Sequence, residues 1–521
     1  MAKSQRHTPF LTRRTLIGGG GIAAGARLFP ARATTTGYGI PRVSLPDFPN
    51  GDAFAGSGPG AIWAQLLTMS SLLHLSPEGS IRGGLALSWS LSADRTQLDL
   101  EIRIDALFSD GARILAEDVR ASVDDARNRY FGTPEAWRWD HLESVELTPE
   151  GAIRLNLTEP DASIPALLAS HLIPIYPAEW LARGWDREAG PFPPASGCYT
   201  MEASSADRLR FGRNDGFYQV GRPRLAGIVC NAPVDIFART TELVTNGVDL
   251  LIDVPLLDVP LLREDPGVML AGGTTNQLCL LTANIRSEAV ADSRLRRLLS
   301  SAIDREDLVR TATAGEAVPA STLIPVDHWA GLDAAIGLAD PDDVRAELAA
   351  LGNPPGIELR LVANEADVAL ANACVLLQEQ LAWAGIALTL DFLADREMEQ
   401  ELAGDAWDVA IHNTPYWSDP HELIRSLFVS GAKPNAGGYR NHRIDYLAGL
   451  ASRAHGNEIR GRLYRTIQEI VQDEVPVIPL FFPNYYDAML AKLQDYPYYP
   501  PMSVLAMRQA TMSRPEPAGL P

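Results

Sequence analysis

Hydrophobic and polar residues alternate from residue 97 to residue 104. Leu98, Leu100, Ile102 and Ile104 are apolar, and polar residues separate them. This period of two predicts a strand with one buried face. The segment Ser109-Asp110-Gly111 predicts a turn, because glycine accepts the positive φ that other residues avoid. Acidic residues 117 and 118 predict the first turn of a helix that opens near residue 115.

Strand and helix patterns alternate again in the second half of the chain. We expect strands at 357–362, 386–392 and 407–411 and helices at 369–384 and 423–428. This alternation predicts an α/β arrangement. Across 292–306 the residues Leu295, Leu298, Leu299, Ala302 and Ile303 lie at helical spacing, which predicts one helix with an apolar face and a solvated basic face.

Length and charge narrow the class of protein. A chain of 521 residues is too long for one ordinary core, so two or three lobes are expected. The net charge is −20, and the first 33 residues hold six basic residues and no acid. The remainder therefore carries 39 basic and 65 acidic residues, a net charge of −26. Such a surface repels nucleic acid and anionic lipid, which excludes both as expected partners.

The N-terminus reads as an export signal. A twin-arginine pattern lies at Thr12-Arg13-Arg14-Thr15-Leu16-Ile17, an apolar run follows to about Ala26, and Ala31-Arg32-Ala33 has the form of a cleavage site. The alternative, a membrane anchor, is disfavoured because the run is about half the length that spans a bilayer. We therefore expect a twin-arginine signal peptide at 1–33 and a periplasmic mature protein.

The four cysteines have no metal-binding spacing. Cys198, Cys230, Cys279 and Cys374 are widely separated and fit no zinc pattern. Cys198 and Cys230 fall in one predicted sheet region and are candidates for a disulfide in an oxidising compartment. Isolated buried thiols are the alternative, which we favour. We expect no cofactor and no bound metal.

The segment from 85 to 122 resembles the signature of the family 5 solute-binding proteins of ABC importers, which bind dipeptides, oligopeptides or nickel. The matching residues are Leu85-Ala86, Trp89, Ser92-Ala93-Asp94, Phe108-Ser109-Asp110-Gly111 and Ala116-Glu117-Asp118-Val119. Later matches follow in the family's order over about residues 70 to 500: Gly197, Tyr199, Arg213-Asn214, Gly247-Val248-Asp249, Ala283-Asn284, Gly315 and 476–482. Ser196 and Cys198 depart from the pattern, which usually has Gly and Pro there.

This resemblance implies a type II (class C) periplasmic-binding-protein fold of the α/β class, with two lobes, an extra subdomain and a ligand cleft at the hinge. It places lobe I at 34–73, 190–275 and 479–510, the extra subdomain at 74–189, lobe II at 276–478 and a tail at 511–521. The strand at 476–482 is the one by which the family returns to the first lobe.

The loop from His412 to His421 follows a predicted buried strand, and ligands of α/β sheets tend to bind at such strand ends. In peptide-binding relatives the corresponding loop reads Trp-x-x-Asp-x-x-Asp-Pro, and its first Asp pairs with the peptide amine. Aligning on Asp419-Pro420 places Tyr416 at that Asp and Asn413 at the Trp. The usual amine anchor is missing, which argues against an ordinary oligopeptide ligand.

The same loop resembles the nickel-type branch of the family, which shows Pro-Tyr-Asp-Pro-His. This chain has Pro415-Tyr416, a two-residue insertion that includes Trp417, and then Asp419-Pro420-His421. Glu135-Ala136-Trp137 is similar to a His-Ala-Trp stretch in that branch, whose Trp lines the pocket. The alternative is a shared aromatic lining without metal, which we favour.

Each candidate ligand contact also has a structural interpretation. His412 and His421 lack the spacing of a shared metal site on one helix and favour hydrogen bonding or capping. Asp419 can cap the next helix instead of touching a ligand. Trp137 can pack in a core, and His171, Tyr485 and Tyr486 are weaker candidates. The predicted ligand contacts are Tyr416, Trp417, Trp137, His412, Asp419, Asn413, His421 and His171.

We therefore expect a monomeric binding protein that closes on a small solute, peptide-like or another amphipathic or chelate compound, and passes it to the permease subunits of an ABC importer. A nickel–chelator complex is the alternative cargo. The competing class is a secreted hydrolase, which the sequence disfavours because it has no Gly-x-Ser-x-Gly, no His-Glu-x-x-His and no phosphate-binding glycine loop. A sensor that uses the same fold has the same sequence features.

Overall fold

The computed structural model describes residues 36–513 apart from 38, 49–53, 55–57, 77–79, 134, 150, 189, 233–237, 353–356 and 500–502. The signal peptide predicted at 1–33 lies outside the described residues, as do residues 514–521 of the predicted tail. No helix among the described residues is long and apolar enough to cross a bilayer.

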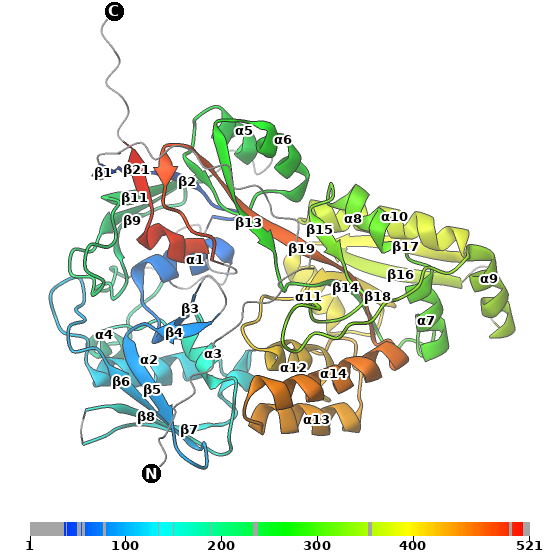
Figure 1. The fold of residues 1–521 in the computed structure, drawn as a ribbon, viewed down its shortest axis with the longest axis horizontal. Coiled ribbons are helices and arrows are strands. Elements are labelled where there is room, and N and C mark those ends of the chain that lie inside the picture. The colour runs from blue at the N-terminus through cyan, green and yellow to red at the C-terminus, as the bar shows by residue number, and fades with distance from the viewer. Residues whose placement is uncertain are drawn as a thin grey trace, which may run out of the picture. The chain divides into compact units, whose positions relative to one another are not determined.

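A mixed sheet of twelve strands dominates the described part of the chain (Figure 1). Its order is β17-β16-β18-β14-β19-β12-β2-β11-β10-β9, and β13 and β15 also pair with β19. The strands are β2 (Arg42–Ser44), β9 (Tyr199–Ser204), β10 (Arg208–Arg213), β11 (Gly227–Asn231), β12 (Leu250–Leu251), β13 (Val268–Thr274), β14 (Cys279–Ala283), β15 (Ala317–Pro319), β16 (Ile357–Asn364), β17 (Ile386–Leu393), β18 (Val409–Asn413) and β19 (Val477–Leu490).

The long strand β19 belongs to both parts of this sheet. Residues 477–483 pair with β14 and β15, whereas residues 484–490 pair with β13. Residues 488 and 489 of β19 also pair with β12. Residues 275–278 make the second connection, because they join β13 to β14. Two neighbouring backbone segments therefore carry the chain from one part of the sheet to the other.

The β16–β18 region has the α/β arrangement expected from the sequence. β16 is parallel to β17 and to β18, and α10 (Val368–Trp383) connects β16 to β17. The helices around it are α9 (Pro341–Ala350), α11 (Asp395–Leu402), α12 (Pro420–Phe428), α13 (His442–Arg453) and α14 (Asn457–Glu474). The predicted strands at 357–362 and 386–392 and the predicted helices at 369–384 and 423–428 are confirmed. The strand expected at 407–411 starts two residues later and ends at Asn413.

The first alternating pattern forms β6 (Gln97–Ile102) in a separate antiparallel sheet, with β5 (Ala86–Leu91), β8 (Ile153–Leu157) and β7 (Leu142–Leu147). Leu98 and Leu100 are fully buried, whereas Ile104 is exposed beyond the strand's end. Gly111 has φ of +88°, as the predicted turn requires. The predicted helix is α2 (Ala116–Arg129), and the Asp118 carboxylate accepts a hydrogen bond from the Leu115 amide at 2.8 Å.

Short elements complete the described residues. They are β1 (Thr36–Gly37), α1 (Pro59–Thr68), β3 (Leu73–Leu75), β4 (Ile81–Gly83), η1 (Ala136–Trp139), α3 (Ile164–Ala169), α4 (Ala178–Ala182), α5 (Arg239–Val244), η3 (Leu256–Asp258), α6 (Val259–Glu264), α7 (Ser293–Ser301), α8 (Arg305–Ala312), β20 (Leu493–Gln494), η4 (Ser503–Arg508) and β21 (Thr511–Ser513). Large apolar clusters lie under β2 and β9–β11, under β16–β18 with α10, and among α12–α14.

The core-packing helix predicted from the spacing of residues 295–303 forms as α7, with Leu295, Leu298 and Leu299 buried, but it ends at Ser301. The chain forms α7 and α8, because the Asp304 side chain accepts a hydrogen bond from the Asp307 amide and starts a new helix. The predicted solvated basic face is also wrong in part. Arg296 and Arg305 are buried, and their guanidinium groups donate to backbone carbonyls of Val475 and Pro479 at 2.8 Å each.

The four cysteines are buried free thiols, so the candidate disulfide between Cys198 and Cys230 does not form. Burial raises the pKa of the Cys198 thiol to about 11. The favoured alternative, isolated buried thiols, is confirmed.

Candidate ligand-binding site

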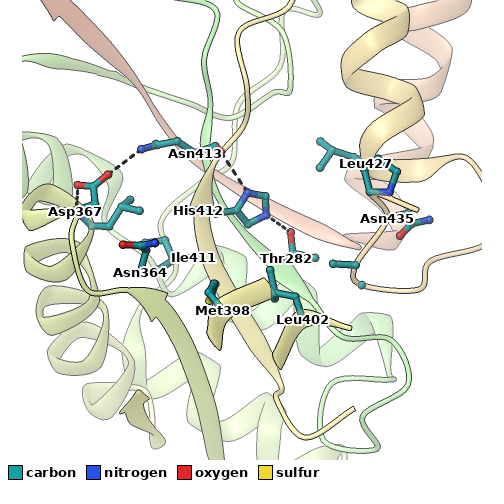
Figure 2. A pocket seen from close by; sticks show the side chains of 14 residues that line it. Thr282, Asn364, Asp367, Met398, Leu402, Ile411, His412, Asn413, Leu427 and Asn435 are labelled. Atoms are coloured by element: carbon teal, nitrogen blue, oxygen red, sulfur yellow. Dashed lines mark hydrogen bonds between the residues drawn. The ribbon is translucent and has the colours of Figure 1, made fainter. Parts of the chain in front are cut away.

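A cavity of about 450 Å³ lies at the carboxyl ends of β16 and β18 (Figure 2). We call it the β16–β18 cavity. Its lining comprises Thr282, Asn364, Asp367, Leu370, Met398, Leu402, Ile411, His412, Asn413, Leu427 and 434–437. Both the position beyond the ends of parallel strands and the volume are typical of small-molecule sites.

One side of the cavity is polar. Asn413 Nδ2 donates to Asp367 Oδ2 at 3.2 Å, whereas Asn413 Oδ1 is buried and has no hydrogen-bond partner among the described residues. His412 Nε2 lies 2.9 Å from Thr282 Oγ1. Burial lowers the pKa of His412 and raises the pKa of Asp367. This side therefore offers an amide, a neutral imidazole and a carboxylate.

The rest of the cavity is mainly aliphatic, with Leu370 on α10, Met398 and Leu402 on α11, and Leu427 on α12. No Arg or Lys is among its lining residues. Because nothing in this lining neutralises a negative charge, the β16–β18 cavity suits an apolar group with a polar or cationic edge.

The sequence prediction identified His412 and Asn413 but missed Asn364 and Asp367. Asn364 ends β16, and Asp367 caps α10 by accepting from the Leu370 amide at 3.0 Å. The rule that selected the loop after β18 also applies to the end of the neighbouring strand. Acidic and amide side chains directly after the strand predicted at 357–362 were the available signal.

Tyr416 lies beyond the end of β18 and is not part of the β16–β18 cavity lining. Its ring meets the ring of Tyr485 on β19 edge to face, with centroids 6.4 Å apart. Burial raises the pKa of the Tyr416 hydroxyl, and the neighbouring Tyr498 and Asp253 act in the same direction. Tyr416 thus joins the loop to the strand that connects the two parts of the sheet.

Trp417, the next residue, is a core residue. Its side chain is 4% exposed and belongs to the apolar cluster of α12–α14. The ring contacts His328 edge to face at 5.1 Å. The packing gives Trp417 a structural role and leaves its predicted ligand contact without geometric support.

Asp419 caps α12, which is the structural alternative predicted for this residue from the sequence. Its Oδ1 accepts from the His421 amide at 2.9 Å. The guanidinium of Arg460 donates to both carboxylate oxygens, at 2.8 and 2.6 Å. Protein donors therefore occupy both oxygens of Asp419, which leaves little capacity for a ligand.

Trp137 and His421 come together although 284 positions separate them in the chain. Their rings meet edge to face at 6.1 Å, and the guanidinium groups of Arg138 and Arg425 lie over the Trp137 ring at 4.8 and 5.2 Å. Arg138 also forms a largely buried ion pair with Glu422 at 2.6 Å. The second wall predicted for the cleft thus contacts α12 directly.

His171 is half-buried in the segment between α3 and α4. Burial lowers its pKa to about 4, and the charge of Arg138 acts in the same direction. No contact in the described part of the chain connects His171 with the β16–β18 cavity, and its ligand role stays a prediction. The described residues contain no group of three or more His, Cys, Asp or Glu side chains that could hold a metal ion.

Acid is expected to destabilise the protein partly through His421. Burial lowers its folded-state pKa to about 4; Asp161 and Asp419 oppose this shift, and Arg425 and Arg460 add to it. An unfolded histidine titrates near 6.5, so between pH ~6.5 and ~4 only the unfolded state binds the proton. When the pH falls from 7.5 to 5.0, the unfolding free energy of the unsubstituted protein should therefore decrease by about 2 kcal/mol more than that of His421→Gln.

Urea unfolding at the two pH values measures this difference. His455→Gln is the control, because His455 is exposed, and it should keep the original pH dependence. If the unfolding free energy decreased equally with acidification in His421→Gln and in the unsubstituted protein, the folded protein would not hold His421 in the neutral form.

These features define a class: a binding protein with a mixed α/β sheet, two chain connections between the parts of that sheet and a small-molecule cavity at strand ends. The model of the bacterial extracellular solute-binding proteins, family 5 (middle region), matches residues 80–435. The chain belongs to this family, and the resemblance inferred from the motifs is confirmed.

Named relatives support the same assignment. The chain is 23% identical over 420 residues to the glutathione-binding protein GsiB of Escherichia coli K12, covering 78% of this chain and 82% of the relative. It is similar in fold to AgaA from A. tumefaciens R10 in complex with agropinic acid, with a TM-score of 0.80, 21% identity, and 92% and 99% of the two chains covered. NikA from Staphylococcus aureus in complex with Ni(L-His)2 gives a TM-score of 0.76 at 18% identity, covering 92% and 100%.

Proposed function

We propose that this chain is a periplasmic binding protein that captures one small solute between two lobes and delivers it to the permease subunits of an ABC importer. The lobe boundaries proposed are those predicted from the sequence. The observation that carries the proposal is the β16–β18 cavity, which lies beside the loop 412–421. A hinge at 275–278 and within β19 would let the lobes close on a solute.

We propose a peptide-like or other small amphipathic solute as the cargo rather than a standard oligopeptide. Relatives of this chain are named for glutathione, agropinic acid and nickel–histidine binding. The aliphatic lining and the Asp367–Asn413 edge suit an apolar body that carries hydrogen-bonding groups.

A nickel–chelator complex is the second candidate. The observation in its favour is the contact of Trp137 with His421, because both residues belong to the nickel-type motifs of the sequence. An aromatic wall and a neutral histidine are compatible with a metal that arrives already chelated.

The remaining parts of the proposal concern the protein's setting. We propose export by the twin-arginine route, a monomeric mature protein, and binding without catalysis. Incubation with the bound solute should leave the solute chemically unchanged, as liquid chromatography with mass spectrometry would detect.

The purified mature protein is expected to bind a small solute and to gain thermal stability from it. Native mass spectrometry of the protein as isolated tests whether a solute is retained. A thermal-shift screen then compares dipeptides, oligopeptides, opine-like compounds, sugars and nickel–histidine complexes. No retained solute, and no stabilisation by these compounds or by a low-molecular-weight periplasmic extract, would contradict the proposed function.

A further inference from the structure

Asp253 follows β12 and has an unusual backbone conformation. Its φ is +56°, in the left-handed region, where Asp and Asn occur more often than most other residues with a side chain. The residue is exposed, and no hydrogen bond to its carboxylate is formed by the residues that the structure describes. Asp253 therefore presents its carboxylate to solvent from a left-handed backbone position.

Two buried charged side chains hold this backbone in place. The Asp253 amide donates to Asp487 Oδ1 at 3.0 Å. The guanidinium of Arg239 donates to the backbone carbonyls of Ile252 and Asp253. Asp487 is fully buried and Arg239 is 3% exposed. The backbone at Asp253 is thus fixed before any solute arrives, which lowers the entropy cost of binding.

Three tyrosines form a row of ring contacts that includes Tyr485 on β19. Tyr416 meets Tyr485 edge to face, and Tyr485 stacks on Tyr498 with ring centroids 6.2 Å apart. The Tyr498 hydroxyl is buried without a hydrogen-bond partner in the described part of the chain. Tyr485 and Asp487 are two residues apart on β19, so their side chains share one face of that strand, and Asp487 binds the Asp253 amide. We call Asp253, Asp487, Tyr416, Tyr485 and Tyr498 the tyrosine–aspartate cluster.

The electrostatics of the cluster favour a cation. Burial raises the pKa of the Asp253 carboxyl to about 7; Arg239 opposes this shift, and the charges of Asp487 and Asp367 increase it. The Arg239 guanidinium is one positive charge beside the two carboxylates of Asp253 and Asp487, so a further positive charge would be stabilised.

We propose that the solute carries an ammonium or guanidinium group that binds between the Asp253 carboxylate and the Tyr416 ring, while its apolar body occupies the β16–β18 cavity. Carboxylates and aromatic faces are the two protein groups that attract organic cations. The loop after β18 connects the two subsites, because Asn413 lines the cavity and Tyr416 follows it by three residues. This inference rests on the proposed function and adds the charge of the ligand to it.

A matched pair of probes tests the charge requirement. Protein freed of co-purifying solute is heated at pH 8.0 with n-butylammonium chloride, or with butan-1-ol and an equal concentration of sodium chloride. The ammonium probe should raise the melting temperature by about 1–2 °C more than the alcohol. An equal effect of the two probes would overturn the inference.

Two variants locate the effect. Asp253→Asn keeps a side chain that tolerates the left-handed conformation and should abolish the difference between the probes. It should also weaken binding of the retained solute about tenfold or more in calorimetry. Asp343→Asn removes an equal charge from an exposed position on α9 that is not among the cavity-lining residues, and should change neither result. Unchanged affinity in Asp253→Asn would overturn the inference, whereas the proposed function fails only if no solute binds at all.

Discussion

Replacing Arg460 with Met is expected to lower the free energy of unfolding by about 3–5 kcal/mol, because the change leaves the Asp419 carboxylate buried without its counter-charge. The side chains of Arg460 and Asp419 are 5% and 10% exposed. Arg460 also donates to the Ala451 carbonyl and to the Tyr464 hydroxyl, at 3.0 Å each. Urea denaturation at pH 7.5, followed by tryptophan fluorescence, measures the loss.

Arg462→Met is the matched control on the same helix. Arg462 pairs with Glu458 at 3.3 Å, but both side chains are largely exposed, so its loss should cost less than about 1 kcal/mol. The double variant Asp419→Asn with Arg460→Met should recover part of the stability, because it removes the buried charge itself. Equal effects of Arg460→Met and Arg462→Met would refute the interpretation of this ion pair.

Substitution of two adjacent aromatic residues, Tyr416 and Trp417, is expected to affect different properties: solute affinity for the first and stability for the second. Tyr416→Ala should weaken binding of the retained solute by about 1–3 kcal/mol, roughly 10- to 100-fold, because it removes an aromatic wall of the proposed site. Trp417→Ala should instead reduce the unfolding free energy by about 3–5 kcal/mol, because it leaves a large cavity in the core. The structural basis is that Tyr416 contacts Tyr485 on β19 whereas Trp417 is 4% exposed within the α12–α14 cluster.

Calorimetry with the retained solute and urea denaturation of both variants separate the two effects. Tyr416→Phe is the control for the affinity change, since it keeps the ring and should lose less than Tyr416→Ala. If Trp417→Ala lowered affinity at full stability, Trp417 would be a ligand contact and the assignment of the two residues would be reversed.

Several buried arginines show what local patterns do not reveal. Arg296 and Arg305 sit among helical residues whose spacing predicts a solvated basic face, yet their guanidinium groups bind backbone carbonyls next to and within β19. Arg239 does the same for residues 252 and 253. A guanidinium group can donate hydrogen bonds to several backbone carbonyls at once. An arginine can therefore be buried where the ends of helices and strands leave carbonyls without a backbone donor. Sequence periodicity contains no information about which carbonyls will be adjacent.

The candidate site also combines residues that the sequence pattern identified with residues that only the packing identified. The loop 412–421 was found from its place after a predicted strand, and His412 and Asn413 do line the cavity. Asp367 and Asp253 were missed because neither belongs to that loop, and Trp417 and Asp419 were included because aromatic and acidic residues in a loop suggest ligand contact. Their burial depends on α14, which begins 38 residues after Asp419. Only packing distinguishes a residue that faces a cavity from one that faces the core.

The sequence by itself determined the family, the α/β class and the elements around residues 98, 360 and 375, because periodicity and short motifs are local properties of the chain. The tertiary structure decided which side chains share a space. It brought Trp137 to His421, Arg460 to Asp419 and Tyr416 to Tyr485, over separations of up to 284 residues. Charge and solvent access at those meeting points depend on distances between remote segments, which is why the proposed cation site became recognisable only in the folded chain.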